Sequence, residues 1–369
     1  MNAFDPLRDS VVPLDDVSRF DAIARSRLSD LLRRMPKAEL HVHIEGCLEP
    51  EMVLDLAHRN HVALPYANVA ALRHAYRFSD LQSFLDVYYT ASAVLRTERD
   101  FHELGMHYFG RAAEDNVVHA ELFFDPQAHI ARGVPMAAVI GGLARACAEA
   151  GDRYGITSAL IMCFLRHLSE DSALATLEQA LPFRDHFVGV GLDSSELGHP
   201  PSKFARLFER CRALGLRRVA HAGEEGPPEY ILEALDLLHV ERIDHGVSCL
   251  DDLAVTRRLA QARIPLTVCP LSNVVLCVFE TMAEHNLPAL LDAGLNVTIN
   301  SDDPAYFGGY VGSNFAAAFK AFERLGPAHA YRLARNSLEA SFASGTQKRN
   351  WIHQLDQVFE ATLASAYQR

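Results

Sequence analysis

The sequence predicts a single-domain α/β protein, a (β/α)8 TIM barrel with extra helices. Eight short apolar runs recur along the chain, and amphipathic segments of helical periodicity separate most of them. Strands that alternate with helices in this way indicate βαβ units and a parallel sheet, and eight such units suit a closed barrel. A doubly wound open sheet is the alternative. The chain has neither GxGxxG nor a GxxxxGK motif, the phosphate-binding sequences typical of that fold.

The composition is that of an ordinary globular protein with an acidic balance of charge. Of the 369 residues, 49% are hydrophobic and 22% are charged, and the net charge is −12. This balance excludes a basic surface for nucleic acid or for an anionic membrane. The seven cysteines are scattered and form no CxxC pair, which indicates reduced thiols. No apolar run is long enough to span a bilayer and no secretory signal is evident, so we expect a cytoplasmic protein.

Three parts are expected along the chain: an N-terminal arm with a leading helix in 1–35, a catalytic barrel in 36–345, and a helical tail in 346–369. Apolar residues at helical spacing in 17–34 predict the leading helix, and the amphipathic pattern of 351–367 predicts the tail. The tail is suited to packing or to a subunit contact, so a homo-oligomer is one expectation.

The first strand carries two histidines on one side. Leu40, Val42 and Ile44 alternate with His41 and His43. Residues two apart on a strand point to the same face, so both imidazoles project to one side and a single ion could bind both. The alternative is the polar side of an edge strand that faces solvent.

Helical spacing predicts helices within 49–115, and strands and helices alternate from there. The other seven strands are expected at 117–124, 158–165, 187–192, 218–220, 240–243, 265–269 and 297–300. Helices are expected at 135–150, 171–180, 202–214, 230–238, 252–262 and 327–340.

Polar side chains follow the end of each predicted strand, and active sites of TIM barrels lie at that face. In chain order they are His41 and His43; Asp125; Arg166 and His167; Asp193 and Glu196; His221 and Glu224; Asp244 and His245; Ser272; and Asp302 and Asp303. Strands emerge into water there, so polar residues are expected in any case. The histidines and carboxylates are the residue types that favour a metal site.

Two of these strand ends have a distinctive local chemistry. His221 is followed by Gly223, which allows a sharp turn, and then by the carboxylate of Glu224. A histidine at a strand end is more often structural than a ligand. The adjacent carboxylates of Asp302 and Asp303 repel each other unless a cation compensates them; the alternative is a cap or an Asx turn before the next helix.

Taken together, the HxH strand, His221, His245 and Asp302, with the HAGE and SDDP motifs, resemble the adenosine/AMP deaminase family of metal-dependent amidohydrolases. The resemblance covers about residues 36–340. It is nearest to the bacterial adenine deaminase branch, as judged from the segments 192–204, 221–230, 240–247, 268–273 and 301–310.

This resemblance implies one Zn²⁺ ion per chain and a deamination reaction at a purine base. The implied zinc ligands are His41, His43, His221 and Asp302, and zinc lowers the pKa of a bound water. The implied catalytic residues are Glu224, which would protonate purine N1, and His245, which would hold or deprotonate the water. Asp303 would hydrogen-bond N7. The products would be hypoxanthine and ammonia, and the role of the protein would be purine salvage in nucleotide metabolism.

Two departures from the nucleoside-specific pattern of the family favour a free base. Glu45 stands where nucleoside deaminases tend to carry a shorter Asp near the sugar, and Ser195 and Glu196 stand where they carry a glycine. We expect Glu196 or Ser195 to contact the N3/N9 side of the base and Glu45 to close the sugar pocket. Alternatively, Glu196 caps the next helix.

Other functions share parts of this pattern. An N6-substituted adenine such as isopentenyladenine, or adenosine, could be the substrate if the pocket near Phe78, Leu81 and Phe84 has room. A non-enzymatic purine-binding protein would not need Glu224 and His245. A phosphotriesterase-like hydrolase would need a bridging lysine at a strand end, and none is seen. The ligand types also suit Fe²⁺ or Mn²⁺.

Overall fold

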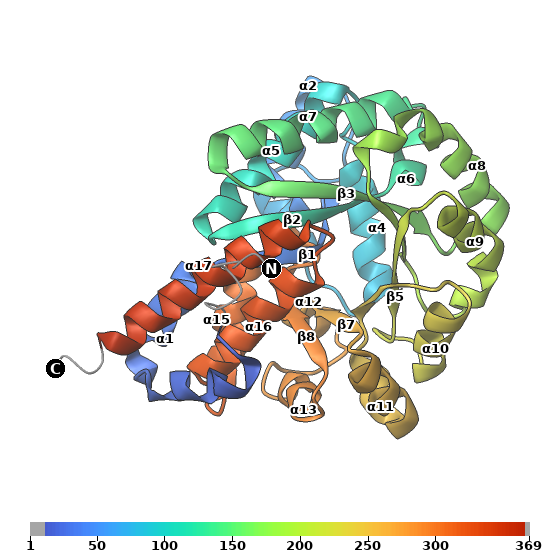
Figure 1. Cartoon of the computed structure of the whole chain (residues 1–369). Coiled ribbons are helices and arrows are strands. Elements are labelled where there is room, and N and C mark those ends of the chain that lie inside the picture. The colour runs from blue at the N-terminus through green and yellow to red at the C-terminus, as the bar shows by residue number, and fades with distance from the viewer. Residues whose placement is uncertain (1–11, 366–369) are drawn as a thin grey trace, which may run out of the picture.

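The computed structural model describes residues 12–365, and all eight predicted strands are present. They are parallel and lie side by side in sequence order, with helices around them, so the predicted (β/α)8 barrel is confirmed (Figure 1). The strands are β1 (Lys37–His43), β2 (Val117–Phe124), β3 (Thr157–Leu165), β4 (Gly189–Asp193), β5 (Arg217–Ala222), β6 (Arg242–His245), β7 (Pro265–Val268) and β8 (Asn296–Ile299).

Helices follow each strand, and further helices precede β1 and follow the last unit of the barrel. The α-helices are α1 (Leu28–Arg34), α2 (Pro50–Arg59), α3 (Val69–Ala75), α4 (Leu81–Ser92), α5 (Glu98–Glu114), α6 (Pro126–Ile130), α7 (Met136–Tyr154), α8 (Glu170–Ala180), α9 (Ala205–Ala213), α10 (Pro228–Asp236), α11 (Leu253–Ala262), α12 (Pro270–Val275), α13 (Leu287–Asp292), α14 (Pro304–Phe307), α15 (Val311–Ala321), α16 (Pro327–Ala340) and α17 (Gly345–Ala364). The 3-10 helices include Leu14–Ala22, Glu45–Cys47 and Pro201–Phe204.

The first and last strands meet at their carboxyl ends. The His43 N–H donates to the Asp302 carbonyl at 2.9 Å, and the Asp302 N–H donates to the His41 carbonyl at 3.0 Å. Val42 and Asp302 form a parallel bridge. This contact brings the ends of β1 and β8, which are remote in sequence, to one edge of the barrel.

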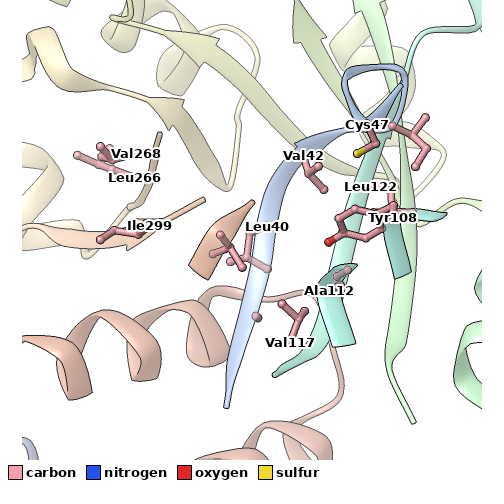
Figure 2. Close-up of a cluster of buried hydrophobic side chains, with 14 of the residues drawn as sticks. Leu40, Val42, Cys47, Tyr108, Ala112, Val117, Leu122, Leu266, Val268 and Ile299 are labelled. Carbon is pink, nitrogen blue, oxygen red and sulfur yellow. The ribbon is translucent and has the colours of Figure 1, made fainter. Parts of the chain in front are cut away.

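The strands are buried on both faces, as expected for a parallel sheet covered by helices. Every residue of β1 is buried. Apolar side chains of β1 and its neighbours form part of the core with α5, and the alternate residues His41 and His43 face the other way. Figure 2 shows one part of this core, including Leu40, Val42, Tyr108, Ala112, Val117 and Leu122.

The leading helix differs from the prediction, because residues 17–34 do not form one continuous helix. The 3-10 helix Leu14–Ala22 ends before an extended backbone at Ile23, and α1 begins at Leu28. Tertiary packing accounts for the break. The centroid of the Phe20 ring lies 5.0 Å from the ring centroids of both Tyr331 and Phe359. These contacts hold the segment against α16 and α17.

The tail helix α17 begins six residues before the amphipathic pattern of 351–367, at the start expected for the tail. It begins at Gly345, where Ser344 and Gln347 form a reciprocal capping box. Residues 1–11 of the expected arm and 366–369 of the expected tail lie outside the described residues. Within the described range, none of the helices has the length and apolar character needed to cross a membrane. The division of the chain at residues 35 and 345 and the homo-oligomer stay predictions.

Candidate active site

Four predicted metal ligands meet at the carboxyl end of the barrel. They are His41 and His43 of β1, His221 of β5 and Asp302 after β8, all buried, with one ligand atom of each within 4.8 Å of the others. The Nε2 atoms of His43 and His221 are 3.2 Å apart, and Asp302 Oδ1 is 3.4 Å from His41 Nε2. Ligands in a tetrahedral complex with zinc bonds of about 2.1 Å lie about 3.4 Å apart. The spacing of this group therefore fits a metal ion of that size.

The second ring nitrogen of each histidine is directed at an oxygen of the protein. The pairs are His43 Nδ1 with Asp193 Oδ2 at 3.5 Å, His221 Nδ1 with Asp244 Oδ2 at 3.6 Å, and His41 Nδ1 with Thr267 Oγ1 at 3.0 Å. The contact with Thr267 is a hydrogen bond and holds the His41 ring in the tautomer that presents Nε2 as a ligand, whereas Asp193 Oδ2 and Asp244 Oδ2 lie close to His43 and His221 without a hydrogen bond to them. The buried Nε2 of His41 has no hydrogen-bond partner, as expected for an atom that coordinates a metal ion.

Glu224 and His245, the residues to which the resemblance gives catalytic roles, stand beside this metal group. His245 Nε2 is 3.5 Å from Glu224 Oε2 and 3.7 Å from Asp302 Oδ2. Burial, followed by the charge of Asp302, raises the pKa of Glu224 well above its ordinary value. A carboxyl group in this state holds a proton near neutral pH and can donate it. Its Oε1 atom is buried and has no partner.

Asp303 lies next to Asp302 and also faces the cavity. Burial and the Asp302 charge raise the pKa of Asp303 well above its usual range, and its Oδ1 atom has no hydrogen-bond partner. Gly46 packs against it so closely that an added Cβ atom would lie 2.6 Å from Asp303 Cα and overlap its carboxyl group. The protein therefore needs a glycine at position 46 to keep Asp303 in place.

Most of these groups line one recess at the carboxyl end of the barrel. Helix α4 supplies one wall through Leu81, Phe84, Leu85, Tyr88 and Tyr89, and Leu276 and Phe307 add further apolar surface. The remaining lining residues are His43, Asp125, Asp193, Ser194, His221, Glu224, His245, Asp302 and Asp303. A small recess with apolar walls and a few polar groups is typical of a site for a small molecule.

The structure does not bring three predicted substrate-binding residues into this recess. Glu45 is fully buried, and its Oε1 atom accepts hydrogen bonds from the Asp125 N–H at 3.1 Å and from His129 Nε2 at 2.7 Å. The Glu196 carboxylate accepts hydrogen bonds from backbone N–H groups of the loop after β5. It therefore does not cap the helix that follows Glu196 in the sequence. Ser195 is half-buried and does not line the recess.

Asp125, Asp193, Ser194, Tyr88 and Tyr89 line the recess, whereas Glu45, Ser195 and Glu196 do not. Asp125 and Asp193 stand at strand ends, which is the signal that could have singled them out. The tyrosines lie on α4, whose Leu81 and Phe84 were expected near the pocket, and the four-residue spacing from Phe84 to Tyr88 on one helix is the signal that could have found Tyr88. Tyr88 Oη donates to Asp125 Oδ2 at 3.2 Å, while the buried Asp125 Oδ1 has no partner.

Comparisons with known proteins agree with this geometry. The adenosine deaminase family model matches residues 36–358. An adenine deaminase of Geotalea uraniireducens is 60% identical over 340 residues, which cover 92% of this chain and 96% of that protein. The crystal structure of an adenine deaminase from Arthrobacter aurescens is 52% identical, with a TM-score of 0.86 over 88% of this chain and 98% of that one.

A second similar structure contains bound zinc. It is an amidohydrolase from Burkholderia ambifaria with bound Zn, 25% identical to this chain, with a TM-score of 0.83 over 97% of this chain and 96% of that one. The family model covers most of the chain, and relatives of 60% identity span almost all of it. The chain therefore belongs to the adenosine deaminase family.

Proposed function

We propose that this protein is a zinc-dependent adenine deaminase that converts adenine and water to hypoxanthine and ammonia, in purine salvage. The relatives of 60% and 52% identity that carry this name support the proposal. The observation that carries it is a single recess that joins a metal group, a buried proton donor at Glu224 and an unpaired carboxyl oxygen of Asp125. That oxygen can accept a hydrogen bond from the N9–H group of adenine, which adenosine lacks.

We infer that His41, His43, His221 and Asp302 hold the zinc ion. Three imidazoles and one carboxylate are normal zinc ligands, and the Burkholderia ambifaria structure supports this choice of metal. When bound, zinc lowers the pKa of a water molecule and so supplies a nucleophile near neutral pH.

The side chains around the metal group have separate tasks in the proposed reaction. Glu224 donates its proton to N1, which makes C6 more electrophilic, and His245 takes a proton from the attacking water. The water oxygen bonds to C6, His245 passes its proton to the amino group, the C6–N6 bond breaks, and ammonia leaves. The remaining hydroxyl proton returns to Glu224 as the C6–O double bond forms, which replaces the proton that N1 keeps. The two protons of water are thereby divided between the products.

The remaining polar residues orient the base. Asp303, which retains its proton because its pKa is raised, donates a hydrogen bond to N7. Burial, together with the charge of Asp193, also raises the pKa of Asp125, so its carboxyl group is neutral and its unpaired oxygen accepts from N9–H. The side chains of α4 cover the ring. In this arrangement Glu45 acts on the base only through the Asp125 backbone.

The test is release of ammonia from zinc-loaded protein with adenine, adenosine and N6-isopentenyladenine offered in parallel. We expect rapid turnover of adenine alone, and a loss of roughly 100-fold or more in kcat for Glu224→Gln. Equal turnover of adenosine would contradict the role of Asp125. Full activity of Glu224→Gln would contradict the assignment of the proton donor.

A further inference from the structure

Strands β4 and β5 pair only at their amino ends. The ladder joins Gly189 to Arg217 and Val190 to Arg218, whereas β5 continues to Ala222. On its other side β5 pairs with β6 as far as Ala222 and His245. The backbone groups at the end of β5 therefore need other partners on the side of β4, because buried N–H and C=O groups are costly when unpaired.

Two side chains supply these partners. The buried guanidinium of Arg166 donates from Nη1 to the His221 carbonyl at 2.7 Å. Glu196 Oε1 accepts from the Gly223 N–H at 2.7 Å, and Oε2 accepts from the next three N–H groups, at 3.0, 2.9 and 2.8 Å, those of Glu224, Glu225 and Gly226. Hydrogen bonds to an ionised carboxylate are stronger than those between neutral groups.

The loop is shaped to surround this carboxylate. Gly223 has a φ of +75°, a conformation that favours glycine. At Gly226, an added Cβ atom would lie 2.6 Å from the Glu196 carboxyl carbon. Glu196 itself is 1% exposed, so no solvent shares its hydrogen bonds.

The proton donor depends on this loop for its position. The Glu224 side chain has little else to hold it, since Oε1 has no partner and Oε2 is 3.5 Å from His245. Its backbone N–H is one of the four that Glu196 binds.

We propose that Glu196 is a positioning residue, which holds the Gly223–Gly226 loop so that the Glu224 carboxyl group reaches the substrate. This inference rests on the proposed role of Glu224 as the proton donor. Glu196 thus acts on the reaction without touching the base.

The experiment is a double-mutant cycle with Glu196→Ala and Glu224→Gln, assayed for adenine turnover. Glu196→Ala is expected to lower kcat by roughly 100-fold, because a misplaced catalytic group slows a reaction by about that factor. The change in KM should be smaller, and the zinc content should not change. In the Glu224→Gln background, Glu196→Ala should lower kcat by less than about threefold. The proton donor is already absent there, so its position no longer affects the rate. Glu196→Gln, which keeps one acceptor oxygen, should be intermediate.

Hydrogen exchange of the loop amides provides a readout that does not depend on the substrate. We expect faster exchange at 223–226 in Glu196→Ala and in Gly226→Ala, which displaces the carboxylate from the other side. Asp21→Asn is the matched control, since the Asp21 carboxylate also accepts a hydrogen bond from a backbone N–H group, that of Ala328 in α16, a helix that packs on β1 and β8. It should change neither exchange at 223–226 nor kcat.

The outcomes separate this inference from the proposed function. An equal loss of kcat in both backgrounds, or unchanged exchange at 223–226 in Glu196→Ala, overturns the positioning role. Loss of zinc together with activity in Glu196→Ala also overturns it, because the residue would then act on the end of β5 that carries His221. By contrast, an unimpaired Glu224→Gln enzyme contradicts the proposed function itself.

Discussion

Replacing Glu121 by glutamine should destabilise the barrel by about 3 to 5 kcal/mol, because it removes the nearer of the two buried carboxylates beside Arg242 and leaves only Asp244, whose Oδ1 lies 3.8 Å from Nε. Glu121 Oε2 lies 2.7 Å from Arg242 Nη1, and both side chains are fully buried. The Phe342 N–H and His119 also bind the Glu121 carboxylate. The change therefore affects a charge pair that water cannot reach.

The electrostatics of the pair give a similar magnitude. Burial alone would raise the pKa of Glu121, but Arg242 and His119 outweigh it and lower the pKa from 4.5 to about 2. That difference corresponds to about 3 kcal/mol of stability. Because the folded-state pKa is the lower one, this stability is present above about pH 4.5 and is lost as the pH falls through about 2.

Urea denaturation at neutral pH measures the effect, with an exposed ion pair as the control. Arg324 Nη1 and Asp292 Oδ2 are also 2.7 Å apart, but their side chains are 55% and 59% exposed. Asp292→Asn should cost less than about 1 kcal/mol, as surface pairs do. A Glu121→Gln loss no larger than that of Asp292→Asn would refute the reasoning, because burial would then add nothing to the pair.

Three further predictions concern the site. Gly46→Ala should lower kcat/KM for adenine by roughly 100-fold with zinc content unchanged, because the new methyl group displaces Asp303; near-normal kinetics would show that Asp303 does not orient the base. Asp125→Ala should cost about 1 to 3 kcal/mol in kcat/KM for adenine, by loss of the acceptor for N9–H, and an unchanged preference for adenine over adenosine would contradict that contact. Removal of metal by a chelator should abolish activity and lower the unfolding temperature, and zinc should restore both, since a tightly bound ligand present at 1,000 times its Kd stabilises a fold by about 4 kcal/mol; an unfolding temperature unaffected by chelation would argue against a metal held by His41, His43, His221 and Asp302.

Much of the fold could be predicted from the sequence because its signals are local. The alternation of Leu40 and Val42 with His41 and His43 sets which side chains share a face, whatever surrounds the strand. The same holds for the apolar runs of the other strands and for the glycine turn after His221. Polar residues at strand ends are collected at one edge by any closed parallel barrel, and the resemblance to a known family singled out four of them as a candidate metal group.

Other features depend on partners that are remote in sequence. The leading helix is broken where Phe20 packs on Tyr331 and Phe359, and helical spacing contains no information about that contact. Glu196 was expected to contact the purine base. The β4–β5 ladder ends early, however, and the Glu196 carboxylate accepts hydrogen bonds from the backbone that follows β5.

The sequence by itself therefore determined the strand pattern and the eight βα units, because backbone alternation and residue chemistry act over a few residues, and its resemblance to a known family supplied the candidate metal ligands. Only the tertiary structure decided how those side chains are supported and what surrounds the substrate. Asp302 joins β1 through backbone hydrogen bonds to a strand about 260 residues away, and Tyr88 reaches Asp125 from a separate helix. Such contacts follow from the closure of the sheet and from packing, which depend on the whole chain at once.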